Sequence, residues 1–474
     1  MKSIFFCTLI CITFAFRNAY SQDSTLTFGI NIQGTLSTPA TPLWFHSNTN
    51  GTMPTKGSFV LSQFGLFKKY NPNNPRFIQW SAGAEVVTYT GISNNLFFSE
   101  LYAAAKFGPV ELSFGQRKEF MGLGDSLLSS GPTAMSSNFR PYPKIQLYTP
   151  RFVNIIPGND IASFKLSYSD GILGAGSIQY GNVSEVPQVY LHQKSVYLRL
   201  GGDRFKLNLY AGFNHQAMWG GEDEIFSGGL KRPVAYKYVI FGKPWARSRV
   251  GNHFGTIDLA AELKTSTGNF LLYRQSIYED GSLITFSNVA DGLNGIRFKR
   301  KITDPLDHSF KINTALLEFI YTKNQGGAIF DFEGGIFGND NYFNHYVYKQ
   351  GWSYKGRALG TPLIASQTLM RDDLPRDPSG FTVNNRIIAI HSALNATWGG
   401  YNILFKGTYS KNFGSYNVPF DNPVNQASFL LYFEKPVSIW KKSIVSVSLA
   451  SDIGKLYPNN SAISLGWKKS GFIR

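Results

Sequence analysis

Hydrophobic and polar side chains alternate along much of this chain with a period of two residues. Between Phe205 and Phe213 every odd position is apolar, and the even positions are Lys, Asn, Tyr and Gly. The preceding segment, 195–200, alternates in the same way, and residues 201–204, Gly-Gly-Asp-Arg, separate the two. Alternation of this kind predicts β-strands with one apolar face, and the glycine pair between them predicts a hairpin turn.

The same alternation recurs far along the chain. It is found at 256–264, at 388–398, at 401–410 after a Gly-Gly turn, and at 445–449 and 463–467 near the C-terminus. Strands and turns follow one another from residue 22 to residue 474 without a domain-scale linker. A sandwich buries its apolar faces, whereas an outer-membrane barrel turns them to lipid. One sandwich core does not hold so long a chain, so the barrel is favoured.

We therefore predict an all-β fold: one large transmembrane antiparallel β-barrel. At roughly 25 residues for each strand and its connection, the chain supplies about 18 strands. Aromatic residues near predicted strand ends, Trp398 with Tyr401 and Tyr457 with Trp467, favour an interfacial girdle.

The first residues predict export. Lys2 precedes a short apolar stretch, 4–16, and Ala19 and Ser21 stand where a signal peptidase requires small residues. We expect residues 1–21 to be a signal peptide and 22–474 a single barrel domain. Cys7 and Cys11 both lie in this leader, which excludes disulfides and cysteine-ligated metals from the remaining chain.

Charge points to acidic partners. The chain has 46 Lys and Arg against 30 Asp and Glu; without Lys2 and Arg17 the net charge is +14. For an exported protein, anionic lipid and acidic polysaccharide fit this excess better than nucleic acid.

Residues 122–157 interrupt the alternation. This stretch holds five prolines and several serines. It predicts a long ordered loop or a plug element folded into the barrel, with a mobile external loop as the alternative.

Catalytic and metal-binding patterns are mostly missing. The seven histidines lack metal-ligand spacing, and no phosphate-binding loop occurs, so we expect no metal, no cofactor and no enzymatic activity. The nearest nucleophile motif surrounds Ser353, which has a lysine where the second glycine belongs. A hydrolase that uses Ser353 with His345 stays open as a third function.

Residues 338–362 are rich in aromatic and amide side chains, which bind sugars by ring stacking and by hydrogen bonds to hydroxyls. The predicted polysaccharide-binding residues are Trp219, Asn341, Tyr342, Trp352, Tyr354 and Arg357. The alternative is that these aromatics line the girdle or pack the lumen.

An ordered series of short motifs resembles the capsule assembly protein Wzi family of Gram-negative outer membranes. The motifs are GQRKE (115–119), LSSG (128–131), NFRPYP (138–143), IPG (156–158), LHQKS (191–195), GFNHQAMWGG (212–221), GNHFGTID (251–258), YRQSIYEDGS (273–282), DGLNG (291–295) and YTKNQGG (321–327). The resemblance covers most of the predicted mature chain, although its final residues, GFIR, lack the usual terminal aromatic of barrel insertion signals.

The resemblance implies an outer-membrane barrel of 18 strands, occluded by inward elements and without enzymatic activity. It also implies binding of capsular or other surface polysaccharide, in support of capsule assembly or retention. As partners we expect this polysaccharide, outer-membrane lipid and the barrel assembly machinery, and we expect a monomer. An outer-membrane porin or transporter is the alternative function.

Overall fold

The computed structural model describes residues 25–245, 248–279, 285–301, 308–331, 333–438 and 443–473. The predicted leader, residues 1–21, lies outside these ranges. Among the helices of the described ranges, none has the length and apolar character needed to span a membrane.

Strands dominate the fold. They are β1 (Leu26–Ser37), β2 (Phe59–Lys68), β3 (Ile78–Gly91), β4 (Asn95–Phe107), β5 (Val110–Gln116), β6 (Lys144–Tyr148), β7 (Val153–Ile156), β8 (Asn159–Ser177), β9 (Glu185–Leu200), β10 (Leu207–Trp219), β11 (Pro244–Trp245), β12 (Ser248–Arg249), β13 (Asn252–Lys264), β14 (Gly268–Tyr278), β15 (Gly292–Arg300), β16 (Lys311–Tyr321), β17 (Ser353–Tyr354), β18 (Arg357–Ala358), β19 (Ile387–Trp398), β20 (Tyr401–Gly414), β21 (Pro419–Val437), β22 (Ser443–Gly454) and β23 (Asn460–Phe472). The helices are α2 (Leu43–His46), α3 (Glu222–Ile225), α4 (Arg232–Phe241) and the 3-10 helix η1 (Gln367–Leu369).

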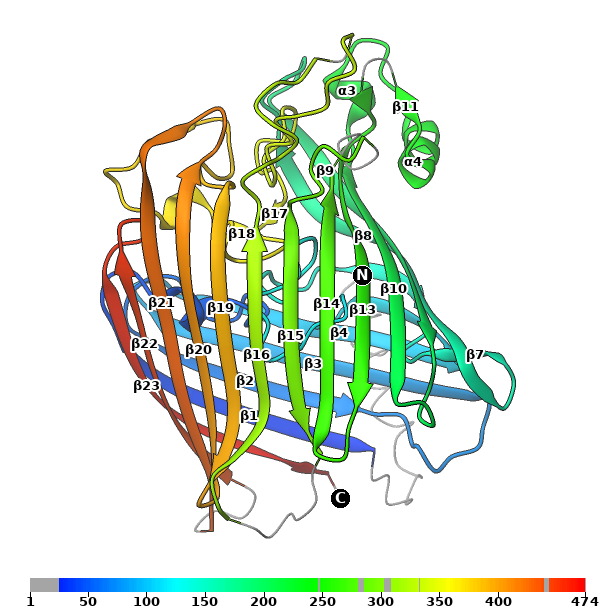
Figure 1. Cartoon of the computed structure of the whole chain (residues 1–474), viewed down its shortest axis with the longest axis vertical. Coiled ribbons are helices and arrows are strands. Elements are labelled where there is room, and N and C mark those ends of the chain that lie inside the picture. Colours follow the sequence, from blue (N-terminus) through cyan, green and yellow to red (C-terminus); the bar gives the residue numbers. More distant parts are fainter. Residues whose placement is uncertain are drawn as a thin grey trace, which may run out of the picture.

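One closed antiparallel sheet forms the barrel wall (Figure 1). Of its 19 strands, β6 and β7 lie end to end along β8, where Tyr148 is opposite Ser167 and Val153 is opposite Phe164. The wall therefore has 18 strand positions in its described part, as predicted from the sequence. The register of β1 against β23, for example Leu36 opposite Ile463, closes the barrel.

The two faces of the wall differ in polarity. On β10, Leu209 is 46% exposed and Phe213 43%, whereas Asn208 and Asn214 are each 1% exposed. Successive side chains of a strand point to opposite faces, so the apolar set points outward and the polar set inward. This is the arrangement of a barrel embedded in lipid, and it confirms the predicted architecture.

The start of β1, the end of β23 and the tight turns lie at one end of the barrel (Figure 1). Gly399 and Gly400 join β19 to β20 with φ of 56° and 80°, a backbone conformation that a two-residue hairpin requires. Beside them, Trp398 and Tyr401 are 61% and 44% exposed, where the girdle was predicted. The prediction for Tyr457 is wrong, because this side chain is only 4% exposed and packs in the lumen-side core.

Long connections emerge at the other end, which we call the outer end. Three of them, 38–58, 117–143 and 322–386, fold into the lumen and are called the plug below. Their apolar residues pack against inward wall residues in one buried cluster that includes Trp44, Leu128, Met135, Phe343, Trp352 and Ile364 from the plug and Phe254, Ile277, Leu316 and Leu404 from the wall. The stretch 122–157 is divided, because its first part enters the lumen while β6 and β7 belong to the wall.

Candidate functional site

A buried carboxylate of the wall holds the second plug loop. Glu318, on the inner face of β16, is 1% exposed. It accepts hydrogen bonds from Ser129 Oγ at 2.8 Å and from the Ser130 amide at 2.7 Å, and also from the hydroxyls of Ser130 and Tyr273. The LSSG motif thus supplies donors to a charge that would be costly to bury without them.

A second carboxylate organises the third plug loop. Asp291, just before β15, accepts hydrogen bonds from the amides of Asn324 at 3.0 Å and Gln325 at 2.6 Å and from Tyr342 Oη at 2.9 Å. Burial raises the pKa of Asp291 to about 6, and the three donors oppose that rise. The motifs at 291–295 and 321–327 meet at this residue.

Arg357 joins the third plug loop to the first. Its guanidinium donates to the carbonyl oxygens of His46, at 3.0 Å, and Met53. Burial lowers the pKa of Arg357 to about 10. The guanidinium also lies 3.2 Å from His46 Nδ1. With two main-chain acceptors and this side chain as partners, Arg357 fixes the path of the first loop.

The residues predicted to bind polysaccharide fall into two separate places. Asn341, Tyr342, Trp352, Tyr354 and Arg357 all belong to the plug. Trp352 and Tyr342 are 0% exposed; the indole of Trp352 donates to Ala134 O at 2.8 Å and stacks on Phe254 with ring centres 5.5 Å apart. In this conformation these two rings have no face open to a sugar.

Of the remaining predicted residues, Asn341 and Tyr354 are half-buried in the plug and Trp219 is 5% exposed. Asn341 accepts a hydrogen bond from Asn385 Nδ2 at 2.7 Å, inside the plug, and Tyr354 meets Tyr142 edge to face at 6.1 Å. Trp219 lies elsewhere: it projects from the outer face of β10 and stacks on Tyr236 of α4 with ring centres 5.5 Å apart.

Ser353 and His345 do not form a nucleophile–base pair. Ser353 is 4% exposed and donates to Gln350 O at 2.6 Å. His345 Nδ1 accepts from the amides of Val347 and Tyr348, each at 3.2 Å. Burial lowers the pKa of His345 to about 3, which keeps the imidazole neutral. Both side chains serve the turn that contains them.

Three outer connections are bonded to one another at the barrel mouth. The amide of Gln179 donates to Val347 O at 2.9 Å, and the amide of Asn182 donates to Ile225 O at 2.7 Å. Tyr348 Oη donates to Gly220 O at 3.0 Å. Residues 178–184, 220–229 and 345–349 therefore form a common base.

Four aromatic rings follow one another in contact, three of them on this base and the fourth, Trp245, on β11. The successive pairs are Tyr346 with Tyr180 at 6.2 Å, Tyr180 with Phe226 at 6.3 Å, and Phe226 with Trp245 at 5.5 Å between ring centres. Tyr180 is 63% exposed and Tyr346 53%. We call these four residues the aromatic row.

Sequence reasoning found only Tyr346, as one of the rings in 338–362. Tyr180 had a weak signal, an aromatic residue beside the turn formers Gly181 and Asn182. Phe226 and Trp245 had none, because the row is assembled from separate loops that share no periodicity.

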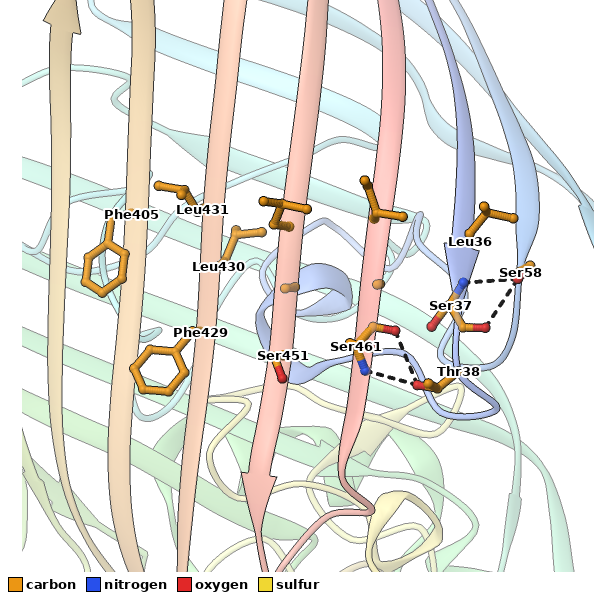
Figure 2. A pocket seen from close by; sticks show the side chains of 14 residues that line it. Leu36, Ser37, Thr38, Ser58, Phe405, Phe429, Leu430, Leu431, Ser451 and Ser461 are labelled. Carbon is orange, nitrogen blue, oxygen red and sulfur yellow. Dashed lines mark hydrogen bonds between the residues drawn. The ribbon is translucent and has the colours of Figure 1, made fainter.

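A shallow hollow on the barrel exterior is unsuited to sugar. It lies over β1 and β20–β23, near hydrogen bonds that join Ser37 to Ser58 and Thr38 to Ser461 (Figure 2). Its large lining side chains include Leu36, Phe405, Phe429, Leu431, Leu449 and Ile463. Apolar side chains on the lipid-facing wall fit acyl chains.

The closed wall, the apolar exterior and the polar interior define an outer-membrane β-barrel. A family model for the capsule assembly protein Wzi matches residues 78–364. That is more than half of the chain, and the protein belongs to the Wzi family of capsule assembly proteins. Its place is the outer membrane.

Comparison with solved structures gives distant likenesses. The chain resembles OccAB4 of Acinetobacter baumannii with 10% identity and a TM-score of 0.49, covering 95% of this chain and 100% of the other. It resembles OccK5 (OpdH) of Pseudomonas aeruginosa with 8% identity and a TM-score of 0.49, covering 96% and 100%. No curated protein matches the sequence.

Proposed function

We propose that this capsule assembly protein binds capsular polysaccharide at its outer mouth, with the aromatic row as the contact surface. The observation that carries the proposal is the set of four aromatic rings in successive contact at a hydrogen-bonded base. Successive ring centres lie 5.5–6.3 Å apart, and the two tyrosines of the row are more than half exposed.

The physical fit is to an extended glycan. Aromatic faces stack on the C–H groups of sugar rings, and the exposed rings of Tyr180 and Tyr346 are the two members of the row that offer such faces. Exposed amides of Gln179 and Asn182 flank Tyr180 and can bridge hydroxyl groups. Because the base is held by main-chain hydrogen bonds, little conformational entropy is lost on binding.

Charge supports an acidic polysaccharide. The support is the overall charge: the predicted mature chain has an excess of 14 positive charges, whereas in the base exposed Lys349 is accompanied by exposed Asp223 and Glu224. Long-range attraction would raise the rate at which an acidic glycan meets the mouth and would weaken as salt is added.

The direct test is Tyr180→Ala with Tyr346→Ala. We expect weaker binding of purified capsular polysaccharide to the purified barrel and lower retention of capsule on cells. Phe77→Ala is the matched control, because Phe77 is 68% exposed at the opposite end of the barrel. If the double variant binds and retains polysaccharide as the wild type does, at equal barrel levels, the aromatic row is not the contact surface.

The rival proposal is a porin or transporter. It requires an open lumen, whereas three loops with a shared apolar core occupy the lumen. A large and stable conductance of the wild-type protein in planar bilayers would favour this rival. We propose no catalytic step, since Ser353 and His345 are bonded to other groups.

We further propose that the barrel acts as a monomer inserted by the barrel assembly machinery. The pairing of β1 with β23 supports this, because a closed wall leaves no strand edge to pair with a second copy. Light scattering of the purified protein, corrected for bound detergent, tests the monomer.

A further inference from the structure

The exterior of the wall changes from apolar to polar near the outer ends of β9, β10 and β13. Outward positions on β9 run from Leu200, Leu198 and Val196 to Lys194 and His192. On β10 the sequence of outward residues passes from Phe213 to His215. Val196 and Phe213 are 42% and 43% exposed, whereas His192 is fully buried. The lipid-facing band therefore ends where another part of the chain covers the wall.

The cover is α4, which packs against the outside of the barrel (Figure 1). Ala235 and Val239, both 0% exposed, pack with Ala217 and Trp219 of β10. The wall residues in these contacts are on the outer face of β10, so α4 packs on the exterior of the barrel and not in the lumen.

Polar contacts fix the helix to the wall. Tyr236 of α4 donates to Asp170 Oδ2 at 2.5 Å, and its hydroxyl lies 2.8 Å from that of Tyr168. Lys194 Nζ donates to Ile240 O near the C-terminus of the helix. These contacts hold α4 immediately beside the end of the lipid-facing band.

The free side of α4 is both apolar and basic. Val234, Lys237 and Phe241 follow the i, i+3, i+7 spacing on the side opposite Ala235 and Val239. Val234 is 46% exposed and Phe241 67%. An exposed phenylalanine next to lysines is the pattern of a helix that lies in a membrane interface.

Four exposed cations lie on α4 or next to its ends: Lys231, Arg232, Lys237 and Lys243. Arg232 is on the side that packs on the wall, where its guanidinium lies 5.5 Å from the centre of the Tyr190 ring. Within the described ranges none of the four cations forms an ion pair with a carboxylate. The exposed acids Asp223 and Glu224 lie on α3, above α4 in the view of Figure 1. The charge beside the lipid-facing band is therefore positive.

We propose that α4 docks a phosphate-bearing lipid of the outer leaflet against the barrel wall. Acyl chains lie along the exposed apolar residues Val196 and Phe213, continuing the lipid-facing band. Phosphate groups meet the ammonium groups of Lys237 and Lys243, and Phe241 inserts beside the chains. This surface is on the barrel exterior and does not depend on the aromatic row or on polysaccharide binding.

The test uses the full purified chain reconstituted in phosphatidylcholine vesicles with or without a minor fraction of lipid A, a phosphorylated glycolipid. Native mass spectrometry after mild extraction counts retained lipid A, and a fluorescent lipid A gives the affinity. In Lys237→Gln with Lys243→Gln we expect affinity to fall roughly 10- to 30-fold, because each surface cation near anionic lipid contributes several-fold.

Lys435→Gln with Lys469→Gln is the matched control. Lys435 and Lys469 lie on β21 and β23 near the opposite end of the barrel, and this variant should retain lipid A as the wild type does. Tyr236 and Trp219 are unchanged in the test variant, so near-ultraviolet circular dichroism should show α4 still packed.

Three results would overturn the proposal. The first is equal lipid A affinity in wild type and the Lys237/Lys243 variant. The second is an equal loss in the control variant, which would mean a general charge effect. The third is equal binding of the deacylated, phosphorylated headgroup in solution, because the site would then recognise an anion without its lipid.

Discussion

The indole nitrogen of Trp352 donates a hydrogen bond to the carbonyl oxygen of Ala134 at 2.8 Å, which joins the third plug loop to the second inside the lumen. The two residues are 218 positions apart in the chain. Contacts of this kind make the plug one unit that is folded against the wall.

Removing the Trp352 ring should loosen the plug. A buried tryptophan replaced by alanine costs about 3–5 kcal/mol, because a large cavity and a lost hydrogen bond remain. In Trp352→Ala we expect faster proteolysis within 322–386 and a higher conductance in planar bilayers. The control is Trp398→Ala. The ring of Trp398 is 61% exposed on the exterior of the wall, beside the hairpin turn at the end opposite the outer end. If Trp352→Ala keeps wild-type conductance and protease resistance, the ring does not hold the plug. If Trp352→Ala also retains less polysaccharide, we expect that loss only together with the opening of the plug, because the buried ring has no face open to a sugar.

Glu318 should be needed to hold the second plug loop. Glu318→Ala leaves the donors of Ser129, Ser130 and Tyr273 without their acceptor, and each unsatisfied buried donor costs about 1–3 kcal/mol. We expect the amide of Ser130 to lose hydrogen-exchange protection. Glu318→Gln, which keeps one acceptor oxygen and the side-chain volume, should lose less. Equal protection in all three proteins would show that packing alone positions the loop.

Asp291 should make stability depend on pH. Its pKa is raised from 3.8 to about 6 in the folded protein, so the folded state holds the proton more tightly. This contribution to stability is fully present below the pKa that Asp291 has in the unfolded state, and it is lost as the pH rises through the pKa that Asp291 has in the folded state. Relative to wild type, Asp291→Asn should gain roughly 2–3 kcal/mol between about pH 4 and about pH 7. Denaturant unfolding in detergent micelles at each pH measures the difference, and a constant difference would contradict the prediction.

The lipid-facing wall predicts a depth-dependent cost for charge. Leu209→Arg should cost about 2–4 kcal/mol if Leu209 lies at the mid-plane of the bilayer, whereas an arginine near an interface costs about 0–1 kcal/mol. Trp398→Arg, beside the hairpin turn, is the comparison. Reversible unfolding in lipid vesicles compares the two, and equal costs would argue against Leu209 at mid-depth.

Much of the wall was predictable. Alternation at 205–213 identified β10 and its lipid-facing residues, because a strand exposes one face to lipid and the other to the lumen along its whole length. The strand number followed from chain length. Tyr457 was misplaced, since proximity to a strand end does not tell whether an aromatic side chain points to lipid or into the lumen.

The sites were less predictable. Residues 338–362 contain the aromatic side chains expected of a glycan surface, and yet Tyr342 and Trp352 are buried in the plug while Tyr346 is exposed at the mouth. A loop has no fixed period, so its sequence does not assign side chains to faces. Tyr180, Phe226 and Trp245 meet Tyr346 only because three connections are bonded together.

The sequence by itself determined the barrel, its two faces, its approximate strand number and the absence of thiols after Cys11. These properties depend on local periodicity and composition. Only the tertiary structure decided which loops fill the lumen, which rings remain at the mouth and that α4 lies on the outside. Those outcomes depend on contacts between residues far apart in the chain, such as Glu318 with Ser130 and Asp170 with Tyr236, and no local pattern encodes them.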